Sequence, residues 1–258
     1  MSNSDYIKRV AELDKLVIQH PAWANAKNGI QHNVLKSQFY RESAGCLLLA
    51  NGGMGKTTVC RAILAQMPLS IKAEKRYEKT IIPAFYTEIP SPATVKSVAG
   101  SLLAKLNDPS PFSGTVAHMT ARLILLLKEC ETKLVLLDEI QNLFDMQKTT
   151  TKVNTSVCNW IKALVNATHV TFCLIGLAEF APILTMDTQL ARRFPLKFEL
   201  LPLHIGCDAN PGPLPPFLAE LKLQVLNRLQ FSQVPHLDRC DTTLQIFAAT
   251  AGNPAFIM

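Results

Sequence analysis

The feature that most constrains the fold is a glycine-rich segment between an apolar run and a helical pattern. Residues 46–50 are apolar, residues 51–58 read Asn-Gly-Gly-Met-Gly-Lys-Thr-Thr, and residues 59–64 continue with a helical pattern. A strand, a glycine-rich loop and a helix in this order form a phosphate-binding P-loop, because the loop's backbone N–H groups can point at phosphate oxygens. A helix that begins near Gly55 would direct the positive end of its dipole at the same phosphates.

The side chains of this loop suit a nucleoside triphosphate bound with Mg²⁺. Lys56 would place a point charge at the β- and γ-phosphates, and the Thr57 hydroxyl would help to hold Mg²⁺. The predicted nucleotide-binding residues are Asn51, Gly52, Gly53, Met54, Gly55, Lys56, Thr57 and Thr58. The usual pattern begins with glycine where this chain has Ala50, and the alternative is a chance match in a glycine-rich turn. The strand and helix on either side favour the P-loop.

Composition adds broad limits. A chain of 258 residues with 48% hydrophobic and 18% charged residues can bury a sizeable core, and its length suggests one large domain, or one domain plus a small one. Its net charge of +6 is compatible with binding nucleic acid, and equally with a mildly basic globular protein. No stretch is long and apolar enough to span a membrane, and the charged N-terminus does not resemble a signal peptide. These observations predict a cytoplasmic protein.

The seven cysteines predict neither a disulfide framework nor a zinc site. Their number is odd, and no two are separated by only two residues. Several lie in apolar runs, where free cysteine behaves as a small hydrophobic residue. This usage favours a reducing compartment.

Apolar runs that alternate with helical patterns predict an α/β fold. Strands are expected at residues 46–50, 81–89, 133–138, 170–175 and 196–201, with helices at 4–18, 22–40, 93–106, 116–129, 154–166 and, in parts, 178–193. The charged residues 70–79 are expected to form a surface loop, and residues 206–216 a linker before helices at 217–229 and from 244. This alternation implies right-handed crossovers and a doubly wound parallel sheet. The predicted parts are an N-terminal helical extension (1–40), a nucleotide-binding core (41–205) and a helical lid (206–258) that is cut short just after a helix start at residues 253–254.

A second motif points to hydrolysis of the bound nucleotide. Residues 133–137 form an apolar run, and Asp138 and Glu139 follow it directly. In P-loop ATPases, the Asp at the end of such a strand orders the Mg²⁺ shell through water, and the next Glu polarises the attacking water as a general base. Alone, the pattern also fits a buried strand that ends in two surface carboxylates. Together with the P-loop it predicts ATP hydrolysis.

Two features near the end of the predicted core bear on the same chemistry. Arg192 and Arg193 precede the fifth strand, where an arginine could act as a finger on a neighbouring subunit's γ-phosphate. A solvated pair of charges at a helix end explains them equally well. After the fourth strand, Gly176-Leu177 replaces the polar residue that often contacts the γ-phosphate there.

Taken together, three segments resemble the TniB/TnsC family of AAA+ ATPases, which regulate DNA transposition. They are the P-loop, the run Asp-Glu-Ile-Gln-Asn-Leu at 138–143 and the run Asp-Thr-Gln-Leu-Ala-Arg-Arg-Phe at 187–194. The resemblance covers residues 15–258 and implies the strand order 5-1-4-3-2, with helices on both faces of the sheet. It implies that Glu139 is the catalytic base and that Arg193 is the finger. Leu177 departs from the family pattern, whereas the region of Gly252 matches it, and no sensor arginine lies among residues 253–258.

The resemblance implies a function and partners. Such proteins bind ATP and Mg²⁺ at subunit interfaces, assemble as hexamer- or heptamer-like rings or helical filaments on double-stranded DNA, and mark a target for the transposase. Partners would include a TniQ-type targeting protein and, in CRISPR-associated elements, an RNA-guided effector. DNA contacts would fall on Thr94, Lys96 and Thr115. A solvated helix face and a helix-capping threonine explain these three residues as well.

Two other functions fit the same motifs. A helicase loader or replication initiator would keep the AAA+ fold and act on a replicative helicase. A nucleotide-binding interaction module would keep the P-loop without turnover.

Overall fold

The structure is a computed structural model. It describes residues 7–8, 11–13, 16–40, 44–73, 77–145, 152–181, 188–207, 210–229, 233–237 and 239–258. The chain divides into two compact units, one of residues 26–51 and 59–199 and the other of residues 1–25, 52–58 and 200–258. Among the described residues, no helix has the length and apolar character needed to cross a bilayer. The predicted domain boundaries at residues 40 and 205 stay a prediction.

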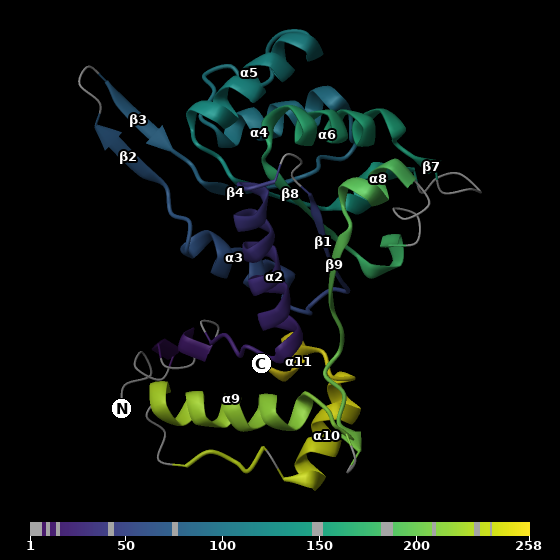
Figure 1. The fold of residues 1–258 in the computed structure, drawn as a ribbon. Helices are drawn as coiled ribbons and strands as arrows, with labels where there is room; N and C mark the ends of the chain where they lie inside the picture. The colour runs from purple at the N-terminus through teal and green to yellow at the C-terminus, as the bar shows by residue number, and fades with distance from the viewer. Residues whose placement is uncertain are drawn as a thin grey trace. The chain divides into compact units, whose positions relative to one another are not determined.

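The larger unit is built on a five-stranded sheet (Figure 1). In spatial order its strands are β4 (Ala84–Glu88), β5 (Leu134–Asp138), β8 (Thr171–Gly176), β1 (Cys46–Ala50) and β9 (Leu196–Leu200). The pairings of β4 with β5, β5 with β8 and β1 with β8 are parallel. When only the five strands of this sheet are numbered along the chain, the order is 2-3-4-1-5. Read from the other side of the sheet it is 5-1-4-3-2, and this confirms the predicted order. The three central strands are buried on both faces, as near-continuous apolar runs in parallel sheets require.

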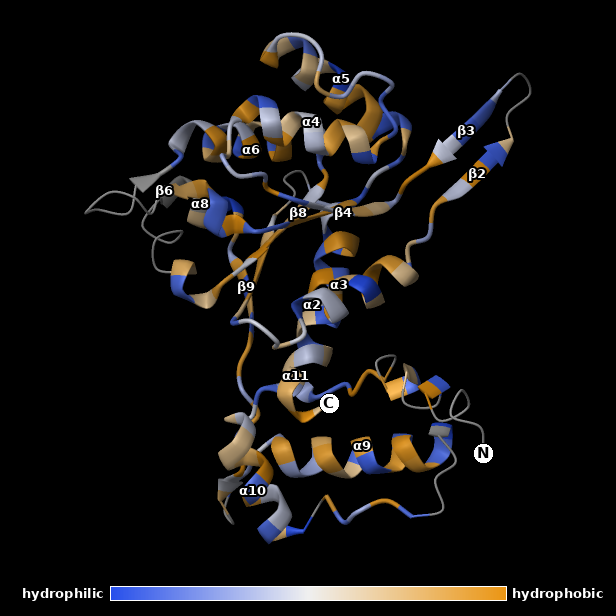
Figure 2. Cartoon of the chain, turned by 180° about the vertical axis from the view of Figure 1, so that it is seen from behind, coloured by the Kyte–Doolittle hydropathy of each residue, from blue (hydrophilic) through white to orange (hydrophobic). Residues whose placement is uncertain are grey.

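Helices cover both faces of this sheet (Figure 1). Helices α4 (Val95–Lys105), α5 (Val116–Glu129) and α6 (Thr155–Thr168) pack with alternate strand residues such as Leu49, Leu137 and Phe172 in one core cluster. Helices α2 (Pro21–Ser37) and α3 (Lys56–Ala65) lie on the other face. The hydropathy colouring of Figure 2 shows the apolar centre of the sheet between these layers.

Phe172 is a large side chain with no exposed surface at the centre of this core. Phe172→Ala is expected to lower the free energy of unfolding by about 3–5 kcal/mol, because it removes a buried ring and leaves a cavity. Chemical denaturation followed by circular dichroism would measure the loss. Leu125→Ala, on the exposed side of α5, is the control and should change stability by no more than about 0.5 kcal/mol. Equal losses in both variants would contradict this account of the core.

The smaller unit has its own apolar cluster. It contains α9 (Leu214–Leu229), α10 (Cys240–Thr250), α11 (Pro254–Ile257) and a short ribbon of β10 (Gly206–Cys207) and β11 (Asn210–Pro211). Leu16 and Ile18 from the N-terminal segment pack with Leu203, Leu214, Phe217, Leu218 and Leu221. In Figure 2, α9 carries hydrophobic and hydrophilic residues in alternation, as expected for a helix with one buried side.

Three predictions about elements were wrong or partly wrong. The expected loop at residues 70–79 contains an antiparallel hairpin of β2 (Ser70–Ala73) and β3 (Glu78–Ile81). Lys72 and Lys79 pair across this hairpin, and both bind Glu131, at 2.8 and 3.3 Å, which offsets their repulsion. The expected linker at 206–216 contains β10, β11 and the start of α9. In the predicted helix at 4–18, residues 7–8 and 11–13 are helical but 16–18 are not.

The remaining elements are two short 3₁₀ helices, η1 (Ile140–Leu143) and η2 (Ala178–Phe180), the helix α8 (Thr188–Arg193) and a ribbon of β6 (Phe144–Asp145) and β7 (Lys152–Val153). Of these, η2 and α8 fall within residues 178–193, which were predicted to be helical in parts, and no element was predicted at residues 140–145 or 152–153. All seven cysteines are free in the structure.

Candidate nucleotide-binding and hydrolytic site

The ends of three strands place the candidate residues at one edge of the sheet. Ala50 ends β1, Asp138 ends β5, and Glu88 ends β4 directly beside Asp138 in the register. Parallel strands end at the same edge, so the P-loop, which continues from Ala50, begins at the edge that carries Asp138. This is where ligands bind in open α/β sheets.

The P-loop has the backbone that its glycines were expected to provide. Gly53 and Gly55 adopt φ angles of +77° and +94°, which glycine tolerates without a Cβ clash. Helix α3 begins at Lys56, so the loop runs directly into a helix N-terminus, where free N–H groups favour anions. Lys56 is half-buried and Thr57 is exposed. The strand–loop–helix context predicted for residues 46–64 is therefore confirmed.

Within the smaller unit, the loop is hydrogen-bonded to the start of α11. The Asn253 side chain donates to the carbonyl of Gly52 at 3.1 Å, and the backbone N–H of Ala255 donates to the carbonyl of Gly53 at 3.2 Å. Asn253 also caps α11 by accepting from the Ala255 N–H. The carbonyl groups of Gly52 and Gly53 thus have partners, and these two bonds use none of the loop's amide groups.

Asp138 is fixed from two directions. It is 5% exposed; its Oδ2 accepts from the Tyr86 hydroxyl at 2.8 Å and its Oδ1 from the backbone N–H of Glu139 at 2.7 Å. Burial, and then the hydrogen bond and negative charge of Asp138, raise the pKa of Tyr86. The phenol therefore keeps its proton at neutral pH and serves as the donor.

Glu139 is held in an unusual backbone conformation. Its φ of 62° and ψ of 42° lie in the left-handed region, which is uncommon for residues other than glycine and clusters at functional sites. The side chain of Gln141 donates to the Glu139 carboxylate. A Cβ on Gly176 would come within 2.8 Å of the Gln141 Oε1 and 2.4 Å of Ile140, so glycine at the end of β8 makes room for this turn.

Arg193 lies at the opposite edge of the sheet. Its carbonyl accepts from the N–H of Gly45, directly before β1, at 2.6 Å. The ring of Phe194 fills the space beside Gly45, where a Cβ would meet it at 2.4 Å. Because β1 runs five residues from Cys46 to Ala50, about 16 Å of strand separates this edge from the one that carries Asp138.

The oxygen donors present fit Mg²⁺ bound together with phosphates. Hydroxyl and carboxylate oxygens, such as those of Thr57 and Asp138, are the hard ligands this ion prefers. Among the residues that the structure describes, no three His, Cys, Asp or Glu side chains gather as a metal site. Mg²⁺ that is bound with a nucleotide takes most of its other ligands from phosphates and water.

Comparison with known proteins identifies the family. The family described as Bacterial TniB protein matches residues 10–201, most of the chain. The chain belongs to the TniB family. No curated protein matches it.

Solved structures confirm the P-loop AAA+ fold of this TniB protein. The Aeropyrum pernix ORC1 protein in complex with DNA is 15% identical, with a TM-score of 0.57 over 93% of this chain and 58% of that one. Cdc6p from Pyrobaculum aerophilum is 16% identical, with a TM-score of 0.51 over 81% and 50%. The Aeropyrum pernix ORC2 protein, in ADPNP–ADP complexes, is 12% identical, with a TM-score of 0.52 over 79% and 50%. The TniB chain therefore spans half to three fifths of the structures it resembles.

The three predicted DNA contacts of the TniB chain lie at helix starts. Thr94 caps α4 in a reciprocal arrangement with Ser97, and Thr115 caps α5 by accepting from the His118 N–H at 3.3 Å. Lys96 is exposed in the first turn of α4. The capping alternative is thus correct for Thr115 as a local role, and the structure shows that Thr94, for which no cap was predicted, has the same role. Capping leaves their exposed surfaces able to meet a phosphate, so the DNA contacts stay a prediction.

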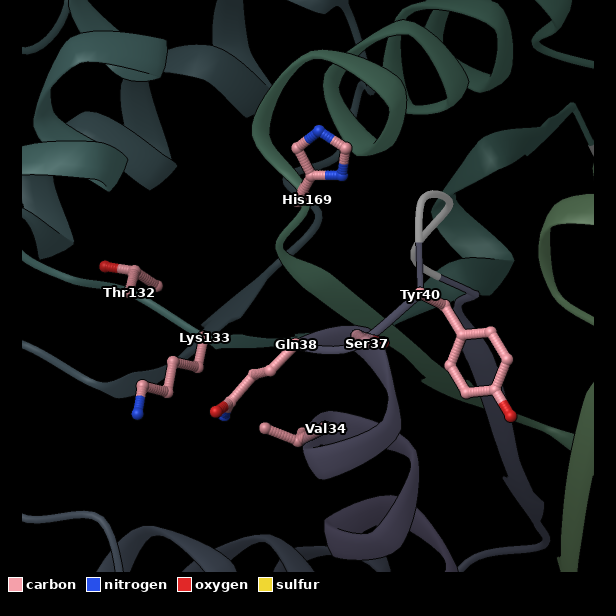
Figure 3. Close-up of a pocket in the computed structure, with 7 residues that line it drawn as sticks. All are labelled: Val34, Ser37, Gln38, Tyr40, Thr132, Lys133 and His169. Atoms are coloured by element: carbon pink, nitrogen blue, oxygen red, sulfur yellow. The ribbon is translucent and has the colours of Figure 1, made fainter.

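A pocket of about 350 Å³ lies at the edge of the sheet that carries Arg193 (Figure 3). It is lined by Val34, Ser37, Gln38, Tyr40, Thr132, Lys133 and His169, which precede β1, β5 and β8. In Figure 3 the Tyr40 ring points away from Gln38 and Lys133. The labelled side chains therefore do not all point to one place in this view.

Sequence reasoning missed three residues that hold the motif residues of this TniB protein. Tyr86 binds Asp138, Gln141 binds Glu139, and Asn253 binds the P-loop. A signal existed for Tyr86, since it lies on the strand predicted beside the one that ends in Asp138. Asn253 was noted only as part of a helix start.

Proposed function

We propose that this chain is an ATP-dependent regulator of DNA transposition that oligomerises on double-stranded DNA, marks the target site and recruits or activates the transposase. ATP hydrolysis would control disassembly. The observation that carries the proposal is that Asp138, which ends β5, and Glu139, which follows it, lie at the same edge of the sheet at which β1 passes into the P-loop. Membership of the TniB family supports the transposition role.

Each motif residue has a distinct role in the proposed reaction. The N–H groups of the loop and Lys56 would bind the phosphates, and Thr57 and Asp138 would hold Mg²⁺. When bound, Mg²⁺ neutralises charge that develops on the phosphate oxygens. Glu139 would accept the proton of the attacking water as a general base. Gln141 keeps the Glu139 carboxylate from turning freely before a nucleotide binds.

Arg193 is proposed to complete the site of a neighbouring subunit. Its backbone lies about one strand length from the edge that carries Asp138, too far for its side chain to reach that edge in its own sheet. A head-to-tail arrangement would bring the Arg193 edge of one subunit to the Asp138 edge of the next. Such an interface repeats as a ring or as a filament.

Assembly on DNA tests the proposal. The chain would be mixed with a non-hydrolysable ATP analogue, duplex DNA, both or neither, and then imaged by electron microscopy and assayed by DNA mobility shift. Oligomers on DNA are expected when analogue and DNA are both present. If the analogue changes neither assembly nor DNA affinity, the proposal is wrong.

Lys56→Ala is expected to lose nucleotide binding and assembly together. Removing a hydrogen bond to a charged group weakens binding by about 10- to 150-fold. Titration with a fluorescent ATP analogue would measure this change, and Lys105→Ala, at the exposed end of α4, is the matched control. Analogue binding of normal affinity in Lys56→Ala would remove Lys56 from the proposed site.

A helicase loader or replication initiator is the second candidate, because the fold is shared with ORC1 and Cdc6 structures. Pull-down of a replicative helicase, with a transposase and a TniQ-type protein tested in parallel, separates the two functions. Capture of the helicase alone would favour this second candidate.

A further inference from the structure

Tyr86 reaches the motif carboxylate from the neighbouring strand. In the parallel register of β4 and β5, Tyr86 lies opposite Leu136 and Glu88 lies opposite Asp138. Side chains two residues apart on a strand project from the same face. Tyr86 and Glu88 therefore share the face of the sheet from which Asp138 projects.

The hydroxyl of Tyr86 has two carboxylates within reach but one proton to donate. It lies 2.8 Å from the Asp138 Oδ2 and 3.3 Å from the Glu88 Oε1. A phenol donates a single hydrogen bond, and the shorter distance assigns it to Asp138. Glu88 is exposed and can turn to water, whereas Asp138 is buried.

The two hydrogen bonds to Asp138 differ in what they control. The bond from the Glu139 N–H to Oδ1 is local and follows from the turn after β5. The bond from Tyr86 to Oδ2 crosses between strands and fixes the rotation of the carboxylate plane. Without it, a single bond to Oδ1 would remain among these contacts, and the plane could rotate about that bond.

We propose that Tyr86 is a positioning residue for the Mg²⁺–nucleotide complex, acting through its hydrogen bond to Asp138. The inference rests on the proposed function, since it assigns Asp138 to the shell of the ion. Tyr86 orients the Asp138 carboxylate before the ligand arrives, so less orientational freedom is lost on binding. Glu88 is a second acceptor for the hydroxyl and is not required for this role.

Tyr86→Phe tests the role of the hydroxyl, because it removes one oxygen and keeps the ring. Binding of a fluorescent ATP analogue would be measured over a series of Mg²⁺ concentrations, beside kcat and KM for hydrolysis and the thermal unfolding midpoint. Loss of a residue that orients a metal ligand costs about 10- to 100-fold in metal affinity. The Mg²⁺ concentration for half-maximal analogue binding should rise by such a factor, with binding restored at high Mg²⁺ and little change in the unfolding midpoint.

Two controls separate positioning from general effects. Tyr40→Phe changes an exposed tyrosine at the other edge of the sheet and should leave the Mg²⁺ dependence as in the wild type. Glu88→Gln leaves the hydrogen bond from Tyr86 to Asp138 in place. The Mg²⁺ concentration for half-maximal analogue binding should therefore change by less than about twofold, well below the change expected when a residue that orients a metal ligand is lost.

An unchanged Mg²⁺ dependence in Tyr86→Phe would overturn the inference, and so would a failure of that variant to fold, which would assign the hydroxyl to stability. An effect of Glu88→Gln as large as that of Tyr86→Phe would also overturn it. Wild-type protein that binds no ATP analogue at any Mg²⁺ concentration would instead refute the proposed function.

Discussion

Glu139→Gln is expected to stop ATP hydrolysis while ATP and DNA stay bound. Glutamine has nearly the same shape as glutamate, but its amide cannot accept the proton of the attacking water. Loss of a general base lowers the rate by about 10²- to 10⁴-fold. Glutamine at this position can still take the left-handed backbone and contact Gln141, so the turn after β5 should keep its structure.

Phosphate release and the lifetime of DNA-bound assemblies would measure this effect. The rate of phosphate release should fall by about 10²- to 10⁴-fold. DNA-bound assemblies formed with ATP should persist as long as those formed with a non-hydrolysable analogue. Glu179→Gln, which changes an exposed carboxylate in η2 after β8, is the matched control and should hydrolyse ATP normally. Phosphate release at the wild-type rate in Glu139→Gln would exclude Glu139 as the base. Wild-type protein that binds ATP without releasing phosphate would favour the non-hydrolysing interaction module.

Arg193→Ala is expected to abolish ATP hydrolysis, and mixing it with the inactive variant Lys56→Ala is expected to restore part of the activity. An arginine finger contributes about 10³- to 10⁵-fold to the rate. Because Arg193 lies at the edge opposite Asp138, the residue should act on a neighbour. Lys56→Ala subunits cannot bind ATP tightly and should not assemble by themselves, but they still carry Arg193, and the ATP at a mixed interface would be bound by the Arg193→Ala neighbour. Mixing the two variants should therefore restore part of the activity at sites formed by an Arg193→Ala subunit and a Lys56→Ala neighbour.

Titration of one variant into the other, with phosphate release as the readout, makes this test quantitative. Activity should rise and then fall as the fraction of Lys56→Ala increases. Arg192→Ala, an adjacent and more exposed arginine, should retain activity by itself. A mixture no more active than either variant alone would argue against action in trans and would favour a solvated pair of charges.

The strands β5, β8 and β1 could be predicted because they are apolar runs bounded by clear breaks, whereas β9 was predicted from its alternating pattern. Residues 46–50 and 133–138 end in motifs whose chemistry requires a strand before them, and both strands are found within one residue of their predicted ends. The helix predicted at 116–129 matches α5 at both ends, since Thr115 supplies a cap and the apolar spacing is regular. The strand order came from the family resemblance, because local sequence carries little information on which strands pair.

The β2–β3 hairpin could not be predicted from local pattern. Its strands are exposed and rich in charge, and lysines lie opposite one another at Lys72 and Lys79. Glu131, distant in sequence, supplies the compensating charge. The roles of Tyr86 and Asn253 could not be predicted for the same reason, because each residue acts through a contact with a residue that is distant in sequence. Arg193 lies in a predicted motif, but Asp187 of the same motif is outside the described residues.

The separation of Arg193 from the Asp138 edge has a consequence for the two ends of an open assembly. If subunits repeat head to tail, one terminal subunit keeps an ATP that no arginine reaches, and the other presents an arginine with no nucleotide to act on. The terminal subunit whose ATP no arginine reaches would hydrolyse that ATP slowly and stay bound. The interior subunits would hydrolyse ATP faster and dissociate more readily. The assembly would then lose subunits in one direction along the DNA. A partner that binds only one of the two unlike ends would therefore always have the filament on the same side of itself along the DNA.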